Sequence, residues 1–119
     1  EKMQLPVVLH CVTAFAPTLE ILKNYHLKAV IFHGFIGSKE QAAEAVKRGY
    51  FLSFGEGVKR SPKTAVALQN APLENLFLET DESNLPIEEI YSIAAEIRGE
   101  DAETIINKIT NNYNRLFQL

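Results

Sequence analysis

Short apolar runs alternate with amphipathic stretches along the whole chain, and no low-complexity segment or linker interrupts the alternation. An apolar run of this kind, rich in β-branched or aromatic residues and bounded by turn residues, is typical of a buried strand. The runs that fit this description lie at 6–11, 28–33, 50–54 and 76–81. The pattern therefore predicts four strands separated by helices.

Apolar residues at helical spacing fill the segments between these runs. Ser38 followed three residues later by Gln41 is a capping-box signature, which predicts the start of a helix. Pro62 is well suited to the first position of another helix. Two further helices are expected after Pro86 and after Asp101, where apolar residues recur at helical spacing.

The predicted order of elements is βαβαβαβαα, which is typical of parallel strands joined by right-handed helical crossovers. Such units occur in open doubly wound sheets and in (β/α)8 barrels. A complete barrel needs about 250 residues, so four units in 119 residues amount to half of one. The turns after the first two runs lack the glycine spacing of a nucleotide-binding loop, which disfavours an open sheet that binds a cofactor. We therefore expect an α/β fold in which four parallel strands with covering helices form half of a TIM-like barrel.

Composition narrows the classes of function and location. The chain carries 15 acidic and 12 basic side chains, a formal net charge of −3, so it lacks the excess of cations expected of a general polyanion binder. Its one cysteine, Cys11, excludes an intramolecular disulfide and is compatible with a reducing compartment, so we expect a cytoplasmic protein. No apolar run approaches the roughly 18 residues of a membrane span, so no membrane partner is expected.

Three residues that can carry chemistry, His10, His33 and Asp81, lie at the carboxyl ends of otherwise apolar runs. Parallel strands end on one side of the sheet, and this side carries the active sites of both α/β architectures. Because side chains alternate between the two faces of a strand, all three residues fall on the face that can point into a barrel. We expect two imidazoles and a carboxylate to converge there.

Two histidines and an aspartate are suitable ligands for a divalent metal ion. An ion held in this way can generate hydroxide near neutral pH or bind a phosphate. The alternative is that each histidine merely forms hydrogen bonds with the backbone near its strand end. The metal site is the stronger interpretation, because three such residues in register on strand ends are harder to explain by chance.

Weaker candidates surround these positions. Glu79 either orients a metal ligand or is simply a polar residue at the barrel mouth. Ser53 and Glu56 end the third run, and Glu56 is either an acid of the site or a solvated loop residue. The basic residues within 59–63 either contact phosphates or are solvated, and the asparagines within 111–114 are expected to serve capping and solvation.

The chain contains a set of recognisable segments in a fixed order: Leu5-Pro6-Val7-Val8-Leu9-His10-Cys11, His33-Gly34-Phe35-Ile36-Gly37-Ser38, Tyr50-Phe51-Leu52-Ser53-Phe54, Leu76-Phe77-Leu78-Glu79-Thr80-Asp81 and Asn114-Arg115-Leu116-Phe117. Together they resemble the second half of the TatD family of metal-dependent hydrolases. The similarity covers nearly the whole chain, and the Leu-Glu-Thr-Asp element is its most specific part. This family has a (β/α)8 barrel and is often described as deoxyribonucleases, so the resemblance implies the C-terminal half of such a barrel.

The resemblance also implies a role for each strand-end residue. His10, His33 and Asp81 would bind metal at the ends of barrel strands five, six and eight. Asp81 would also act in catalysis, by taking a proton from the attacking water. The family pattern implies two divalent ions (Mg, Mn or Zn), and nucleic acid or a related phosphoester as the substrate.

The family's His-x-His on the first strand and its glutamate on a middle strand have no counterpart here. We therefore expect residues 1–119 to be a single partial domain, with barrel strands five to eight and the C-terminal helices, that lacks the N-terminal half. Such a fragment should self-associate or pair with the missing half, and alone it should show little catalysis.

Two departures from the family pattern motivate another interpretation. Val12 and Thr13 stand where the family commonly has arginine and aspartate, and the segment 82–85 replaces a basic, proline-rich loop. A metal-free accessory domain that retains the fold and only binds partners would explain both departures. An open α/β sheet that binds a small ligand is the third interpretation.

Overall fold

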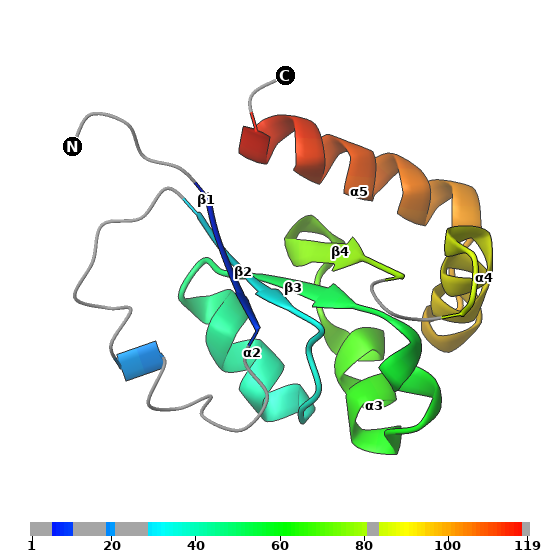
Figure 1. Cartoon of the computed structure of the whole chain (residues 1–119), viewed down its shortest axis with the longest axis horizontal. Coiled ribbons are helices and arrows are strands. Elements are labelled where there is room, and N and C mark those ends of the chain that lie inside the picture. Colours follow the sequence, from blue (N-terminus) through cyan, green and yellow to red (C-terminus); the bar gives the residue numbers. More distant parts are fainter. Residues whose placement is uncertain (1–5, 11–18, 21–28, 81–83, 118–119) are drawn as a thin grey trace.

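The computed structural model describes residues 6–10, 19–20, 29–80 and 84–117 of the 119-residue chain, with the backbone alone at 6, 7 and 10. Strands, α-helices and two short 3-10 helices (η) follow one another as shown in Figure 1: β1 (Pro6–His10), β2 (Ala29–His33), α2 (Lys39–Lys47), β3 (Phe51–Phe54), η1 (Glu56–Lys59), α3 (Pro62–Asn70), η2 (Leu73–Asn75), β4 (Leu76–Leu78), α4 (Ile87–Arg98) and α5 (Ala102–Phe117).

The four strands form one parallel sheet in the order β1-β2-β3-β4, so the predicted parallel arrangement is confirmed. The register sets His10 opposite His33, and Phe54 of β3 opposite Leu78 of β4. An open doubly wound sheet reverses its strand order at a switch point, and the order of the described strands has no such reversal. Sequential parallel strands are the arrangement of a barrel.

The two faces of the sheet have different surroundings. One face packs against the helices and supplies the main core, with Phe32, Leu52 and Phe54 completely buried. Figure 1 shows α2 and α3 together beneath this sheet, α4 next to α3, and α5 passing β4. Burial of each large apolar side chain stabilises the fold by about 1.5–3 kcal/mol, so this face anchors the helices to the sheet.

The opposite face is the inner face of the half barrel. Near the strand starts it carries a small apolar cluster of Ala29, Ile31 and Phe51, which Leu116 of α5 covers. Val8 lies on the same face, because it is opposite Ile31 in the register, and 58% of its surface is exposed. The inner face is therefore only partly covered within the described residues.

Local sequence signals explain where the helices begin and end. The Ser38 hydroxyl accepts a hydrogen bond from the Gln41 backbone N–H (3.2 Å), and the Gln41 side chain accepts one from the Ser38 N–H (3.0 Å). This reciprocal pair is the predicted capping box, and it begins α2. Gly99 ends α4 in the left-handed region at φ 67°, where a residue without a Cβ is favoured.

Two expectations from the sequence are wrong. The fourth strand is shorter than the predicted 76–81, because regular pairing ends at Leu78. Of the two described residues that follow, Glu79 continues the pairing, since its N–H donates to the Phe54 carbonyl (2.9 Å). Asn112 is buried rather than solvated. Its amide donates to the carbonyls of Leu73 (2.8 Å) and Leu76 (2.9 Å), which lie where η2 meets β4.

No helix in the described part of the chain combines the length and the apolar character that crossing a membrane requires.

Candidate functional site

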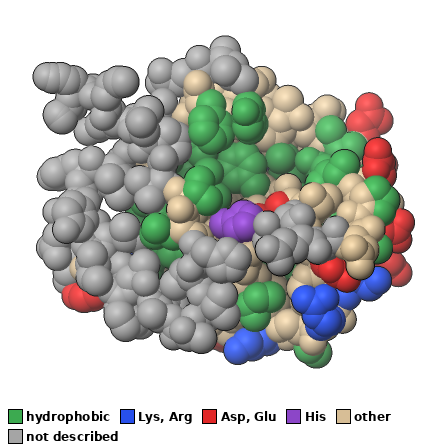
Figure 2. Space-filling view, in the orientation of Figure 1, with side chains coloured by type: hydrophobic (Ala, Val, Ile, Leu, Met, Phe, Trp, Pro, Cys, Tyr) green, Lys and Arg blue, Asp and Glu red, His purple; other side chains and the backbone are tan. Residues whose placement is uncertain are grey.

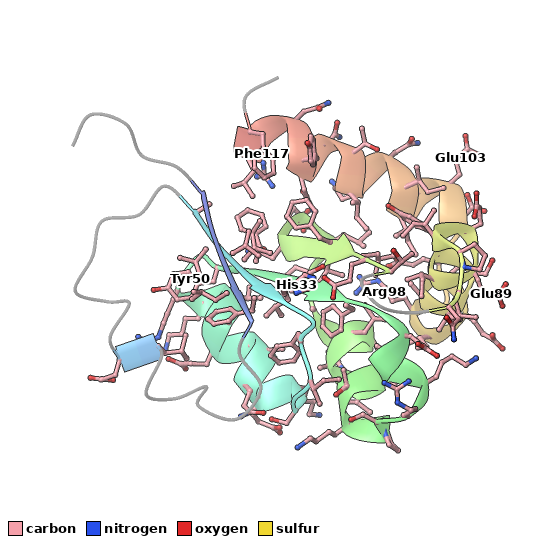
Figure 3. The ribbon with its side chains drawn as sticks, in the orientation of Figure 1. His33, Tyr50, Glu89, Arg98, Glu103 and Phe117 are labelled. Carbon is pink, nitrogen blue, oxygen red and sulfur yellow. The ribbon has the colours of Figure 1, made fainter. Side chains whose placement is uncertain are left out.

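Three polar side chains meet on the inner face, where the strands end. His33 is the last residue of β2, Ser53 belongs to β3, and Glu79 directly follows β4. They share this face because side chains alternate along each strand and the three strands are in register. Figure 3 shows His33 at the centre of the molecule, where β2, β3 and β4 lie side by side.

The Glu79 carboxylate is the centre of this group. The Ser53 hydroxyl donates a hydrogen bond to Glu79 Oε1. The same oxygen lies 3.3 Å from His33 Nε2. The side chains of His33 and Glu79 are 29% and 13% exposed, and Ser53 is buried, so the contact is largely shielded from solvent. We call these three residues the strand-end cluster.

Backbone hydrogen bonds hold the three strand ends at fixed separations. The Phe35 N–H, in the loop after β2, donates to the Ser53 carbonyl (2.9 Å). The Glu79 N–H donates to the carbonyl of Phe54, the next residue of β3 (2.9 Å). Gly34 turns the chain directly after His33 at φ 64°, a conformation that glycine adopts without strain. The strand-end cluster therefore rests on a rigid frame, which is what a site needs to hold its groups in place.

The other residues predicted for the site are placed less completely. The His10 backbone lies opposite His33 in the sheet, but its side chain and all of Asp81 lie outside the described residues. Their function as metal ligands therefore stays a prediction. Glu56 is in η1, where its carboxylate lies 3.6 Å from the guanidinium of Arg60, one turn further on.

The strand-end cluster has suitable donor chemistry for a divalent cation. Glu79 Oε1 is an acceptor that lies 3.3 Å from His33 Nε2, a ring nitrogen that carries a proton in one tautomer of imidazole and a lone pair for a cation in the other. Imidazole and carboxylate are common ligands of Zn²⁺ and Mn²⁺, and carboxylate of Mg²⁺. Among the described residues, no group of three His, Cys, Asp or Glu side chains is placed to hold a metal, so further ligands would have to come from elsewhere.

Known proteins resemble this chain over its whole length. The family described as TatD related DNase matches residues 1–118. Human "Deoxyribonuclease TATDN3" is 31% identical over 128 aligned positions, which cover 98% of this chain and 47% of that protein. The "Uncharacterized metal-dependent hydrolase YjjV" of Escherichia coli is 29% identical, over 100% of this chain and 52% of that protein.

Solved structures agree with the fold. The crystal structure of YjjV, a TatD homologue from Escherichia coli, superposes with a TM-score of 0.88 at 30% identity, covering 97% of this chain and 51% of that one. A TatD-family hydrolase from Entamoeba histolytica gives a TM-score of 0.81 at 14% identity, which supports the fold alone. The chain spans about half the length of the curated relatives it matches.

Proposed function

The chain belongs to the family of TatD-related DNases, and from this premise we propose that it supplies one side of the active site of a metal-dependent hydrolase that cleaves phosphodiester bonds. The observation that carries the proposal is the strand-end cluster, in which the ends of three parallel strands of a half barrel bring an imidazole and a carboxylate into contact. Relatives named as deoxyribonucleases and as metal-dependent hydrolases support it.

His10, His33 and Asp81 are the proposed metal-binding residues. His10 and His33, which are opposite each other in the sheet, would bind one ion, and Asp81 would reach a second. When bound, Mg, Mn or Zn ions would supply a hydroxide nucleophile near neutral pH and stabilise the charge of the phosphate. Asp81 would accept the proton of the attacking water. In this proposal, residues 1–119 are barrel strands five to eight plus the C-terminal helices, and the other half supplies the remaining ligands.

The proposed substrate is nucleic acid or a related phosphoester. Exposed Lys59, Arg60 and Lys63 follow β3, at the strand end that carries the cluster. In Figure 2, acidic side chains gather instead at the edge of the molecule formed by α4 and the start of α5, and basic side chains gather below the centre. An anionic substrate would approach from the basic side. A cytoplasmic location is part of the same proposal.

One experiment tests the proposal directly. The full-length gene product should contain divalent metal by elemental analysis and should hydrolyse an oligonucleotide. Asp81→Ala should abolish turnover and leave the melting temperature nearly unchanged, and Glu89→Ala, a change at an exposed position of α4, should affect neither. Activity retained in Asp81→Ala would contradict the assignment.

A metal-free binding domain is the second candidate. It is favoured by the departures from the family at Val12, Thr13 and 82–85. A full-length protein purified without bound metal, and unable to bind Mn²⁺ or Zn²⁺ on titration, would establish this alternative.

A further inference from the structure

Gly55 is in close contact with Glu79. It follows β3 directly and has φ −136° and ψ −150°, a backbone conformation that does not require glycine. A Cβ built on Gly55 would lie 3.1 Å from the Glu79 carbonyl oxygen and 3.2 Å from Glu79 Cγ. Both distances are shorter than the 3.4 Å at which ordinary van der Waals contacts begin. The absence of a side chain at Gly55 therefore provides the space that Glu79 occupies.

Glu79 cannot move away from this contact without losing others. Its N–H is bound to the Phe54 carbonyl, which fixes the backbone beside β3. Its Oε1 accepts the hydrogen bond from Ser53 and faces His33 Nε2. A displacement of Cγ by a few tenths of an ångström would be transmitted along the short side chain to Oε1. The orientation of the carboxylate is therefore set jointly by Ser53 and Gly55.

We propose that Glu79 is a positioning residue for the metal-binding imidazole of His33, and that Gly55 holds it there by leaving room for its side chain. The inference rests on the proposed function. A fixed carboxylate 3.3 Å from Nε2 restricts the rotation of the imidazole and favours the tautomer that carries its proton on Nε2, which leaves Nδ1 to receive a cation. Carboxylates that support ligating histidines in this way typically change metal affinity by 10–100-fold.

The chain offers a matched pair of glycines for the test. Gly57 is two residues further on, in η1, and a Cβ there would meet the flexible end of Ile36 (Cδ1 at 2.6 Å) rather than Glu79. Gly55→Ala and Gly57→Ala thus make the same chemical change in the same loop. Only the methyl group of Gly55→Ala would contact Glu79 and displace its side chain.

The experiment measures the dissociation constant for Mn²⁺ and Zn²⁺ by calorimetry, with kcat and KM, in the full-length gene product. Gly55→Ala should weaken metal binding by about tenfold and Glu79→Gln by about 10–100-fold, with kcat reduced at saturating metal and KM little changed. Glu79→Gln keeps the shape of the side chain, so it tests the proposal even where Gly55→Ala fails to fold. Gly57→Ala should change the metal affinity less than about twofold.

The outcomes separate this inference from the proposed function. If the wild-type protein binds metal tightly and both Gly55→Ala and Glu79→Gln bind it equally tightly, the positioning role is wrong and the hydrolase proposal stands. If the wild-type protein binds no metal, both are wrong. A loss of affinity in Gly55→Ala that is matched in Gly57→Ala also overturns the inference, because disturbance of the loop would then suffice.

Discussion

Glu79 Oε1 lies 3.3 Å from His33 Nε2, although β3 separates β2, which ends at His33, from β4, which Glu79 directly follows. Strands that are next-but-one neighbours in a flat sheet are about 9 to 10 Å apart. Two side chains meet more readily across that distance when the sheet curves toward the face they share. The contact is thus consistent with the inward curvature of a barrel wall, and it sets an imidazole against a carboxylate at the barrel mouth.

Self-association of the 119-residue chain is the first prediction. Within the described residues, β1 pairs only with β2 and β4 only with β3, and Val8 on the inner face is 58% exposed. Unpaired sheet edges and open apolar surface favour pairing with another chain. Sedimentation velocity of the isolated chain should therefore show a dimer or larger species, or a complex with the other half of the barrel when that half is added.

A matched pair of substitutions tests whether the chain associates through its inner face. Val8→Lys should weaken the association about tenfold or more, because it introduces a charge into the apolar inner face. Val66→Lys, at a 40% exposed position on the outer helix α3, should leave the association unchanged. A stable, monodisperse monomer of the isolated chain would contradict the prediction.

The Arg98 side chain should contribute strongly to stability. It is only 8% exposed, and its Nη1 donates to the carbonyls of Leu68 and Ala71 at the end of α3, both at 2.6 Å. Arg98→Met removes these donors and leaves buried carbonyls unsatisfied, so we expect a loss of about 2–3 kcal/mol in the free energy of unfolding by urea.

The control for Arg98 is Arg60, whose side chain is 70% exposed and whose ion pair with Glu56 is 3.6 Å long. Arg60→Met should cost less than about 0.5 kcal/mol, as exposed ion pairs usually contribute little. Equal losses in the two variants would show that the hydrogen bonds to α3 do not stabilise the fold.

Asn112 tests the polar contact between α5 and the start of β4. Asn112→Leu keeps the branching and the number of side-chain heavy atoms but leaves the Leu73 and Leu76 carbonyls without their donor, so a loss of about 2–3 kcal/mol is expected in urea denaturation. Asn111→Leu, at an exposed neighbouring position, should change the stability by no more than about 0.5 kcal/mol.

The sequence contained the signal for the fold and part of the signal for this asparagine. Short apolar runs with helical stretches between them predicted the strands and the half barrel, because both patterns are local. Helical periodicity also groups Asn112 with Ile105, Ile109 and Leu116 on one buried face of α5. The prediction of solvation treated the asparagines within 111–114 as one group and did not use this spacing.

The site was less predictable, because its geometry depends on contacts between distant segments. Strand alternation predicted that His33 and Glu79 share a face, and it left open whether Glu79 orients a ligand. Nothing local marks Gly55 as a neighbour of Glu79, because its close contact arises only when β3 and β4 pair.

Glu74 should make the stability depend weakly on pH. A backbone hydrogen bond and the ammonium of Lys108 (3.6 Å away) lower the pKa of this carboxyl below 4.5. A lowered pKa in the folded state means that the stabilising contribution is present above pH 4.5 and is lost as the pH falls through the folded-state pKa. Because the carboxylate is 59% exposed, water and salt screen the contribution, and it should be small.

A double-mutant cycle measures this contribution. Glu74→Gln should be slightly destabilising in urea at about pH 7 and less so at about pH 3. In a Lys108→Met background the difference between the two pH values should shrink. A difference that is unchanged without Lys108 would show that Lys108 does not lower the pKa, and would leave the backbone hydrogen bond and the charge of Arg115 as its causes.

The last prediction concerns the cations that follow β3, and it depends on the proposed nucleic-acid substrate. Lys59 and Lys63 are exposed at the end of the sheet where the strand-end cluster lies. Lys47 is the last residue of α2, which leads to the start of β3, so it lies near the opposite end of the sheet. If a strand of DNA crosses the cluster, each lysine that neutralises a phosphate releases counterions and steepens the dependence of binding on salt. In the full-length protein, Lys59→Gln with Lys63→Gln should raise the dissociation constant for a single-stranded oligonucleotide and reduce the slope of log K against log salt by about 1.4. Lys47→Gln should leave the slope unchanged, and the same reduction in that variant would mean that net charge, rather than the position of these lysines, determines binding.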